Sequence, residues 1–530
     1  MDVIQVVDEG TFWNPITYAV FLPLLGALVL LLVPRTQEQL QKGVALATTL
    51  ATAAIGVFIL TDFDYDRAGD LQYYANLGWI EVINSRYIVG LDGISLPLFA
   101  LTMLVVPLCI IYSWNHVPDP GNVKAFFALL LVLETGMLGS FVAQDLILFF
   151  VFFGVVLLPM YFLIGVWGGE QRQYASIKFF LFTLFGSALM IVAFLALYFL
   201  SDQVLVGGEM MHSFDMTLLP QLAATGVSST AALWIFGGMF IGFGIKVPMF
   251  PFHTWLPDAH TQAPTVGSVI LAAVLLKLGT YGFVRIAIPI LPEAAESWAP
   301  IIGLSAVIGI IYGALCCLAQ TDMKRLIAFS SVAHMGFTML AISTLTTFGI
   351  NAAIFGMVAH GLITGMLFFL AGSAKERYHT LEIARLGGLL KQAPRMGWIL
   401  GFCVMASLGL PGLAGFWGEF PAILSAYEPN VGGSVFGWMT GQELFRGYMV
   451  VAAIGTVFAA GYLLWLYQRV AFGLPKAEFA EDPNIHDVTT VEWIAWLPLL
   501  VLIVVFGFLP GIIMNVTNPA VVQSMAAFGG

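Results

Sequence analysis

Three charged side chains lie inside long apolar stretches of this sequence, where lipid would exclude them. Lys246 occurs in Gly242-Phe-Gly-Ile-Lys-Val-Pro-Met-Phe-Pro-Phe-His, Lys277 in Val269-Ile-Leu-Ala-Ala-Val-Leu-Leu-Lys, and Glu419 after a glycine-rich run. A lysine at the centre of a membrane span costs about 2.5–3.5 kcal/mol, so one that is retained needs a partner, water or a function. Ammonium and carboxyl groups accept and release protons, and the three residues therefore predict an ion path through the bilayer, with protons as the ion.

Further titratable groups extend this set. His253 and His260 lie between the two lysines, His334 and His360 follow them, and Glu134 adds a carboxyl group in another apolar stretch. Histidine titrates near neutrality and can relay protons. Protons fit this arrangement better than metal ions do, because a protonated lysine cannot ligate a cation. Structural interpretations remain open for each residue, namely a snorkelling lysine, a buried ion pair, a core histidine or an ordinary capped loop.

The elements that must position these residues are membrane helices. Hydrophobic residues make up 59% of the 530 residues and charged residues 10%, whereas soluble chains have roughly 45–50% and about 25%. Apolar runs of about 20 residues recur from end to end, and the composition predicts an all-α polytopic membrane protein with about fourteen spans. The acidic N-terminal residues do not resemble a cleaved signal peptide, so the first span is expected to stay. The spans are expected to start near residues 16, 44, 94, 123, 145, 178, 231, 265, 300, 325, 350, 397, 447 and 491.

Basic residues divide unequally between the two sides of these spans. Four of them, Arg67, Arg86, Arg285 and Arg446, fall on one side. The other side receives Arg35, Lys42, Lys124, Arg172, Lys178, Lys324, Arg325, Lys375, Arg377, Arg385, Lys391, Arg395, Arg469 and Lys476. The positive-inside rule predicts that the richer side is cytoplasmic and that both termini lie outside the cytoplasm. The net charge of −11 argues against nucleic acid as a partner, and lipid is the expected surroundings.

Two helices are expected to be discontinuous. Pro248 and Pro251 follow Lys246, and Pro411 lies among glycines before Glu419. Proline lacks a backbone donor and disfavours a helical residue before it, so both helices should break there. The two breaks have the same rank in helices 4–8 and 9–13, which predicts two inverted five-helix repeats. The corresponding domains are residues 1–122, 123–290, 291–470 and 471–530.

Motifs for redox cofactors or nucleotides are not apparent. The four cysteines, Cys109, Cys316, Cys317 and Cys403, lie within expected spans and form no CxxC pair, so an iron–sulfur or zinc site is not expected. No Walker loop, HExxH or dinucleotide fingerprint occurs. Any redox chemistry would belong to other chains.

Several stretches together carry a family resemblance. These are Leu256-Pro-Asp-Ala-His-Thr-Gln-Ala-Pro with the run through Lys277, Gln320-Thr-Asp-Met-Lys-Arg-Leu-Ile-Ala-Phe-Ser-Ser, and Leu91-Asp-Gly-Ile-Ser. The sequence resembles, over nearly its whole length, the antiporter-like subunits of proton-pumping NADH:quinone oxidoreductase, respiratory complex I. A glutamate at position 419 resembles the subunit M (chain 4) branch of this family, whereas the sister subunits L and N carry lysine at that position.

The resemblance implies a fold and a function. It implies fourteen helices and one proton channel lined by Lys246, Lys277, His334, His360 and Glu419, driven from a distant quinone site. It also implies L- and N-type membrane partners, flavin, iron–sulfur clusters and quinone in partner subunits with none in this chain, and a bacterial-type inner or plasma membrane. Two alternatives remain, a subunit of a cation/proton antiporter or of a related membrane-bound hydrogenase or dehydrogenase, and a passive membrane scaffold.

One position departs from the family pattern. The family keeps a glutamate in helix 5 as the partner of the helix 7 lysine, within a pattern matched here by Phe152-Phe-Gly-Val-Val-Leu-Leu-Pro-Met-Tyr, and this chain has Gly154 there. Glu134 lies near the middle of the preceding helix. We therefore expect Glu134 to replace the missing glutamate as the partner of Lys246. Two alternatives remain, namely that Lys246 has no acidic partner or that proton pumping is impaired.

Overall fold

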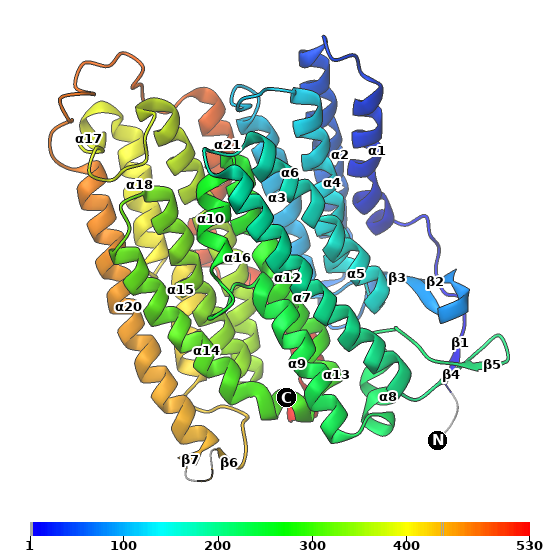
Figure 1. Cartoon of the computed structure of the whole chain (residues 1–530). Coiled ribbons are helices and arrows are strands. Elements are labelled where there is room, and N and C mark those ends of the chain that lie inside the picture. Colours follow the sequence, from blue (N-terminus) through cyan, green and yellow to red (C-terminus); the bar gives the residue numbers. More distant parts are fainter. Residues whose placement is uncertain (1–3, 436, 438, 530) are drawn as a thin grey trace.

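The computed structural model describes residues 4–435, 437 and 439–529, and its long helices lie alongside one another in a bundle (Figure 1). Twelve segments of this part of the chain are long and apolar enough to cross a membrane. They are α1 (Pro15–Leu32), α2 (Glu38–Asp62), α4 (Val123–Val142), α5 (Leu146–Val155) with α6 (Leu157–Trp167), α7 (Arg172–Leu200), α9 (Ser229–Lys246), residues Thr265–Ile290, α14 (Pro292–Leu318), α15 (Met323–Ser343), α16 (Thr347–Tyr378), α20 (Gly441–Ala471) and α21 (Thr490–Phe508). Their starting residues lie within ten residues of those expected.

Two further apolar elements are shorter than a full span. Helix α3 (Leu96–Tyr112) has 17 residues, and a broken helix is formed by α18 (Pro394–Ser407) and α19 (Ala414–Ser425). The expected number of fourteen is reached when each of these is counted as one span. That number, the division into inverted repeats and the domain boundaries stay predictions.

The central helices are shielded from lipid by the outer ones. The apolar parts of α15 and α16 and of residues 265–290 are almost completely buried, whereas α2, α20 and α21 expose large apolar side chains such as Val57, Val457 and Ile494. Helices that are apolar all round are typical of a membrane interior, because lipid tails solvate their outer faces. The titratable side chains of interest lie mainly on the central helices.

The predicted break after Lys246 is confirmed. Helix α9 ends at Lys246, and the chain resumes helical structure in α10 (Trp255–Gln262). Carbonyl groups freed by the break find side-chain donors: Trp255 Nε1 donates to the carbonyl of Ile245 at 2.9 Å, and Ser305 Oγ of α14 donates to that of Phe250. These bonds satisfy backbone groups that lipid could not.

The second predicted break, between α18 and α19, is also confirmed. Gly409 and Gly412 adopt positive φ angles of 72° and 94°, which side chains other than hydrogen disfavour. Pro411 lies between them. The glycine-rich run thus ends α18 and redirects the chain before Glu419.

Residues Thr265–Ile290 form an irregular helix. Two π-helical turns, Leu271–Leu275 and Phe283–Ala287, separate α11 (Thr265–Ile270), α12 (Leu276–Gly282) and α13 (Ile288–Ile290). Lys277 lies in α12, between the two π turns. Such turns recur at functional sites, because they leave backbone carbonyls without a regular partner.

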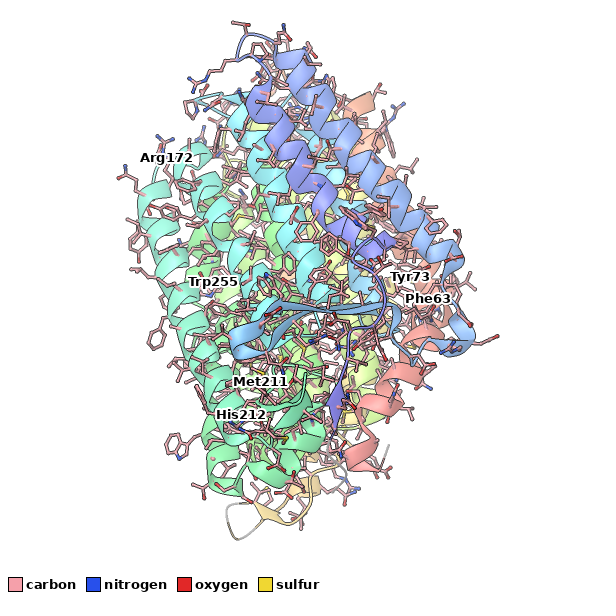
Figure 2. All side chains as sticks on the ribbon, turned by 90° about the vertical axis from the view of Figure 1, so that its right-hand side faces the viewer. Phe63, Tyr73, Arg172, Met211, His212 and Trp255 are labelled. Carbon is pink, nitrogen blue, oxygen red and sulfur yellow. The ribbon has the colours of Figure 1, made fainter. Side chains whose placement is uncertain are left out.

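Small β-structures cover one end of the bundle and were not expected from the sequence. Strands β2 (Gln72–Ile80) and β3 (Ser85–Leu91) form a hairpin, while β1 (Gln5–Val6), β4 (Val204–Val206) and β5 (Glu209–Met211) form a second sheet. Figure 2 views this side, where Tyr73 of β2 and Met211 of β5 are labelled. A third pair, β6 (Ser434–Val435) and β7 (Met439–Thr440), precedes α20.

The hairpin is fastened to the bundle by Asp145, which lies between α4 and α5. Its carboxylate accepts hydrogen bonds from the backbone of Arg86 at 3.0 Å and from Ser85 Oγ at 3.1 Å, and it caps α5 through the N–H groups of Ile147 and Leu148. Burial raises the pKa of Asp145 to about 6.

Both ends of the described chain lie at the hairpin. Glu9 pairs with Asn76 of β2, and the additional C-terminal helix α22 (Gly511–Ser524) places Val516 against Gly93, just after β3. The segment 471–530 therefore holds two helices, α21 and α22, rather than the single helix expected. Termini at the same end require an even number of crossings.

Candidate functional site

Four titratable side chains from four helices form a row in the centre of the bundle. Nζ of Lys277 (α12) lies 2.7 Å from Nδ1 of His360 (α16). The ring centroids of His360 and His334 (α15) are 6.1 Å apart, and Nδ1 of His334 lies 2.5 Å from Oε1 of Glu419 (α19). All four residues were expected from the sequence to belong to the proton path, and the structure brings them together.

The directions of the hydrogen bonds follow from the donor chemistry. A protonated lysine can only donate, so Nδ1 of His360 accepts and the ring proton lies on Nε2. Nε2 of His360 has no hydrogen-bond partner among the described residues. On the other ring, Nε2 of His334 lies 3.2 Å from Ser407 Oγ and 3.1 Å from the Tyr462 hydroxyl.

A cavity of about 30 Å³ lies beside the two rings. Its polar lining consists of His334, His360, Glu419, Thr338, Thr364 and Ser407. A water molecule needs roughly 10–15 Å³ of such space and two to four polar partners. The cavity can therefore hold one or two waters that bridge the gap between the histidines.

Lys277 owes its position to the π-helical turn before it. Its Nζ donates to the carbonyl of Ala272, in that turn, at 2.5 Å, and the residue has no solvent exposure. Gly279 lets α12 approach α9 closely, because a Cβ there would lie 2.6 Å from the carbonyl of Phe243. The same contact packs α12 against the C-terminal end of α9, which ends at Lys246.

Glu419 is placed by close backbone packing after the second break. A Cβ on Gly418 would lie 2.6 Å from the Cα of Gly356, so α19 and α16 touch through glycines. Gly409, with its positive φ, faces the carboxylate, since a Cβ there would lie 3.3 Å from Glu419 Oε2. Glycine at both positions leaves room for the carboxylate beside His334.

Lys246 is buried at the end of α9, but it has no acidic partner. Its side chain is 3% exposed, and its ammonium group lies 4.9 Å from the centroid of the Phe153 ring, within cation–π range. It forms no ion pair within the described part of the chain. A cavity of about 10 Å³, lined in part by Val247, Pro248 and Ser305, adjoins the break and has room for about one water.

The other two predicted histidines are buried, and neither is hydrogen-bonded to this row in the described structure. His253 packs between the rings of Phe250 and Tyr312, with centroid distances of 5.7 and 5.0 Å. His260 stacks on Phe368 at 4.5 Å and 2°, and neither of its ring nitrogens has a partner among the described residues. No hydrogen bond joins either histidine to Lys246 or Lys277 in the described structure.

The expected pairing of Glu134 with Lys246 is not found. Glu134 is fully buried, neither carboxylate oxygen has a partner among the described residues, and Cys109 of α3 is close enough to be influenced by its charge. Its helix turns Gly136 and Gly139 towards Phe152 of α5. Glu134 is two residues before Gly136, about 200° around the helix, and so points away from α5. The described structure has no direct Glu134–Lys246 pair, because a depth along the helix does not fix the direction of a side chain; a pairing through water stays a prediction.

The space at Gly154 is open. A Cβ at this position would meet no atom within 4 Å. Its neighbour Phe153 is the residue whose ring lies under the Lys246 ammonium group. The position at which the family pattern has glutamate is therefore half-buried and unfilled.

Three buried groups that contact other elements were not singled out from the sequence. Lys324, expected on the cytoplasmic side, is 3% exposed and donates to the carbonyl of Ala263 at 2.5 Å. Arg285, expected on the outer side, forms a buried ion pair with Asp92. Tyr462 contacts His334 from α20, and nothing in its sequence surroundings marks it. For Arg285, its place inside the long helical segment Thr265–Ile290 was an available signal.

Known families match this chain along most of its length. The family described as NADH:quinone oxidoreductase/Mrp antiporter, TM, matches residues 143–440. The family described as NADH-ubiquinone oxidoreductase chain 4, amino terminus, matches residues 71–140. Together the two matches contain the row of titratable residues and the hairpin.

Similar proteins span almost the whole chain. NADH-quinone oxidoreductase subunit M of Rhodobacter capsulatus is 40% identical over 512 residues, 96% of each chain. NADH-ubiquinone oxidoreductase chain 4 of Marchantia polymorpha is 35% identical over 511 residues, 96% of this chain and 97% of the relative.

Solved structures share the fold. A chain of respiratory complex I from Thermus thermophilus with bound NADH superposes with a TM-score of 0.83 at 28% identity, covering 97% of this chain and all of that one. A chain of the Mrp complex from Dietzia sp. DQ12-45-1b gives 0.79 at 20% identity, covering 96% and 52%, and shares the fold alone. The chain is an integral, multi-pass membrane protein, and it belongs to the NADH-quinone oxidoreductase subunit M, or chain 4, family.

Proposed function

We propose that this chain is the proton-translocating, antiporter-like membrane subunit of an NADH:quinone oxidoreductase of the complex I type. The observation that carries the proposal is the row from Lys277 through His360 and His334 to Glu419, with a water-sized cavity beside it. The similarity to subunit M proteins along 96% of the chain supports the same function.

The row suggests an order of proton transfers. The Lys277 ammonium group gives a proton to Nδ1 of His360, which releases its Nε2 proton to water in the cavity. That water protonates His334, whose Nδ1 passes a proton to the Glu419 carboxylate. Each transfer moves one proton, and the sequence of transfers leaves Lys277, His360 and His334 neutral and Glu419 protonated.

Coupling along the path would be electrostatic. Charge on one buried site raises the cost of charge on the next, because the interior screens charges poorly. Lys246 would act as the second lysine site, near α12 but without an acid of its own, and His253 and His260 would lead protons between that region and water. Glu134 is a buried acid outside the row, and replacing it by glutamine tests whether it takes part in the path.

The surroundings of the chain follow from the same proposal. The basic loops would face the cytoplasm of a bacterial-type inner or plasma membrane, with both termini outside. Partner chains would include L- and N-type antiporter-like subunits, and flavin, iron–sulfur clusters and quinone would lie in other subunits. Lipid would cover the apolar outer helices.

A second candidate function rests on the fold. The Mrp complex and an archaeal membrane-bound sulfane sulfur reductase contain chains that superpose with TM-scores of 0.79, at 20% and 21% identity. A subunit of a cation/proton antiporter or of a related membrane-bound oxidoreductase would use the same buried lysines. The chains that co-purify with this one distinguish the candidates, because only the complex I assignment requires NADH-oxidising flavin and iron–sulfur subunits.

Replacing Glu419 by Gln and Lys277 by Met in the assembled complex tests proton translocation. Membrane vesicles should lose NADH-driven acidification at least about tenfold, because a positioned acid or base contributes two or more orders of magnitude to proton transfer. NADH oxidation by an artificial acceptor that bypasses quinone should be unchanged, which verifies assembly. His212→Ala, outside the row, is the matched control. Unchanged acidification in both path variants would favour the passive scaffold.

A further inference from the structure

The detached half-helix α10 is fastened at both ends by basic residues from two other helices. Asp258, near its start, lies 2.7 Å from Nζ of Lys178 in α7 and 3.4 Å from the Arg325 guanidinium group in α15. At its other end, Lys324 of α15 donates to the carbonyl of Ala263. The half-helix is therefore held between the first predicted repeat, through α7, and the second, through α15.

Lys324 differs from the other two basic residues in its burial. Lys178 and Arg325 are 20% and 44% exposed, whereas Lys324 is 3% exposed. A buried ammonium group is retained only with strong compensation. Its acceptor is the carbonyl at the C-terminal end of α10, where the backbone dipoles place negative charge. A capping interaction of this kind fixes the end of a helix only two turns long.

His260 lies on this short helix, three residues before Ala263. It is fully buried, and neither ring nitrogen has a partner among the described residues. Its ring stacks flat on Phe368 of α16, and Lys324 and Lys277 are both close enough to act on it electrostatically. Two ring nitrogens without a partner, near two lysines, suit a group that exchanges protons through water.

We propose that Lys324 is a positioning residue, which holds α10 through the Ala263 carbonyl and so places His260 on the route by which protons reach Lys277. This inference rests on the proposed function. His260 is the group that exchanges the proton, and Lys324 acts through it. The two repeats then share one relay element, because α10 comes from the first repeat and its anchor from the second.

A double-mutant comparison in the assembled complex tests this role. We expect Lys324→Met to lower NADH-driven proton translocation at least about fivefold, as expected for a misplaced proton-transfer group. The rate is normalised to NADH oxidation by an acceptor that bypasses quinone, which measures the amount of assembled complex. His260→Ala should give a loss of similar size. In the His260→Ala background, Lys324→Met should cost less than about twofold more, because residues that act as one unit are not additive.

Two further variants serve as controls. Lys324→Arg keeps the charge and the donor and should recover most of the activity. Lys375→Met removes an exposed positive charge near Lys324 without touching α10, and it should leave translocation unchanged. If Lys324→Met does not assemble, Lys324→Gln enters the same comparison, and the same criterion applies to it.

The outcomes separate this inference from the proposed function. Full activity of Lys324→Met, or multiplied losses in the double variant, would overturn the positioning role. Loss of translocation in the Glu419→Gln variant together with normal translocation in His260→Ala would also overturn it and leave the proposed function standing. Normal translocation in the Glu419 and Lys277 variants would reject the proposed function itself.

Discussion

Nδ1 of His334 lies 2.5 Å from Oε1 of Glu419, while Lys246, at the other broken helix, has no acid beside it in the described structure. Lys246 and Glu419 each lie beside a break in a helix. Only Glu419 forms a donor–acceptor pair with a neighbouring titratable side chain, that of His334. The asymmetry gives the second half of the chain a defined proton acceptor. It leaves the charge of Lys246 to be set by the Phe153 ring and by water.

Replacing Glu134 by Gln tests whether this acid takes part in the path. Neither of its oxygens has a partner among the described residues, so removing its charge should break no hydrogen bond or ion pair. We expect proton translocation within about twofold of the unmodified complex and an unchanged or higher melting temperature, because a buried unpaired charge is costly. A loss as large as that of Glu419→Gln would mean that Glu134 reaches Lys246 through water.

Gly154→Glu restores the acid that the family pattern predicts. The space beside Gly154 is open, so the side chain should fit without displacing its neighbours. Its carboxylate would then pair with Lys246 and add a charge partner to the first half of the path. We expect a complex that assembles normally and whose translocation per NADH is equal or higher. Gly154→Gln, of the same size and without charge, is the control, and equal effects of both variants would contradict a role for charge.

The titratable residues of the site could be predicted from the sequence, whereas much of the helix packing around them could not. Prolines and glycines determine both breaks locally, and the burial of Lys246 and Lys277 follows from the apolar residues around them. The burial of Lys324 does not, because a lysine near a helix end reads as a cytoplasmic charge until the partner helix is known. The π-helical turn whose Ala272 carbonyl accepts a hydrogen bond from Lys277 likewise depends on packing between helices.

Side-chain direction was the other limit. Glu134 was expected to face Lys246 because the two share a similar depth, but rotation about the helix axis is set by Gly136 and Gly139 packing on Phe152. The β2–β3 hairpin was missed because its residues lie between apolar spans and include several aromatic residues, which are also common at membrane–water interfaces. Tyr462 carries no signal at all, since an isolated tyrosine in an apolar helix is common.

Gly409→Ala should disturb the acidic end of the row. The residue has a φ of 72°, and a Cβ would lie 3.3 Å from Glu419 Oε2, so the substitution combines backbone strain with pressure on the carboxylate. Left-handed backbone costs an alanine about 1–2 kcal/mol. We expect a lower melting temperature and a severalfold slower translocation. Gly433→Ala has a φ of 74° but open space around its Cβ, and it should cost stability without slowing translocation.

The buried pair of Arg285 and Asp92 should be needed for stability rather than for proton transfer. Asp92 is 3% exposed, and its Oδ1 also accepts hydrogen bonds from the backbone of Ile94 and Ser95. Removing one partner of a buried ion pair costs about 3–5 kcal/mol, because the other charge is left unpaired. Arg285→Met should therefore lower the melting temperature strongly. The double variant Asp92→Asn/Arg285→Met removes both charges while keeping the oxygen acceptor, so it should recover much of that loss. Measured in detergent by thermal unfolding, a double variant less stable than Arg285→Met would show that the two charges do not act as a pair.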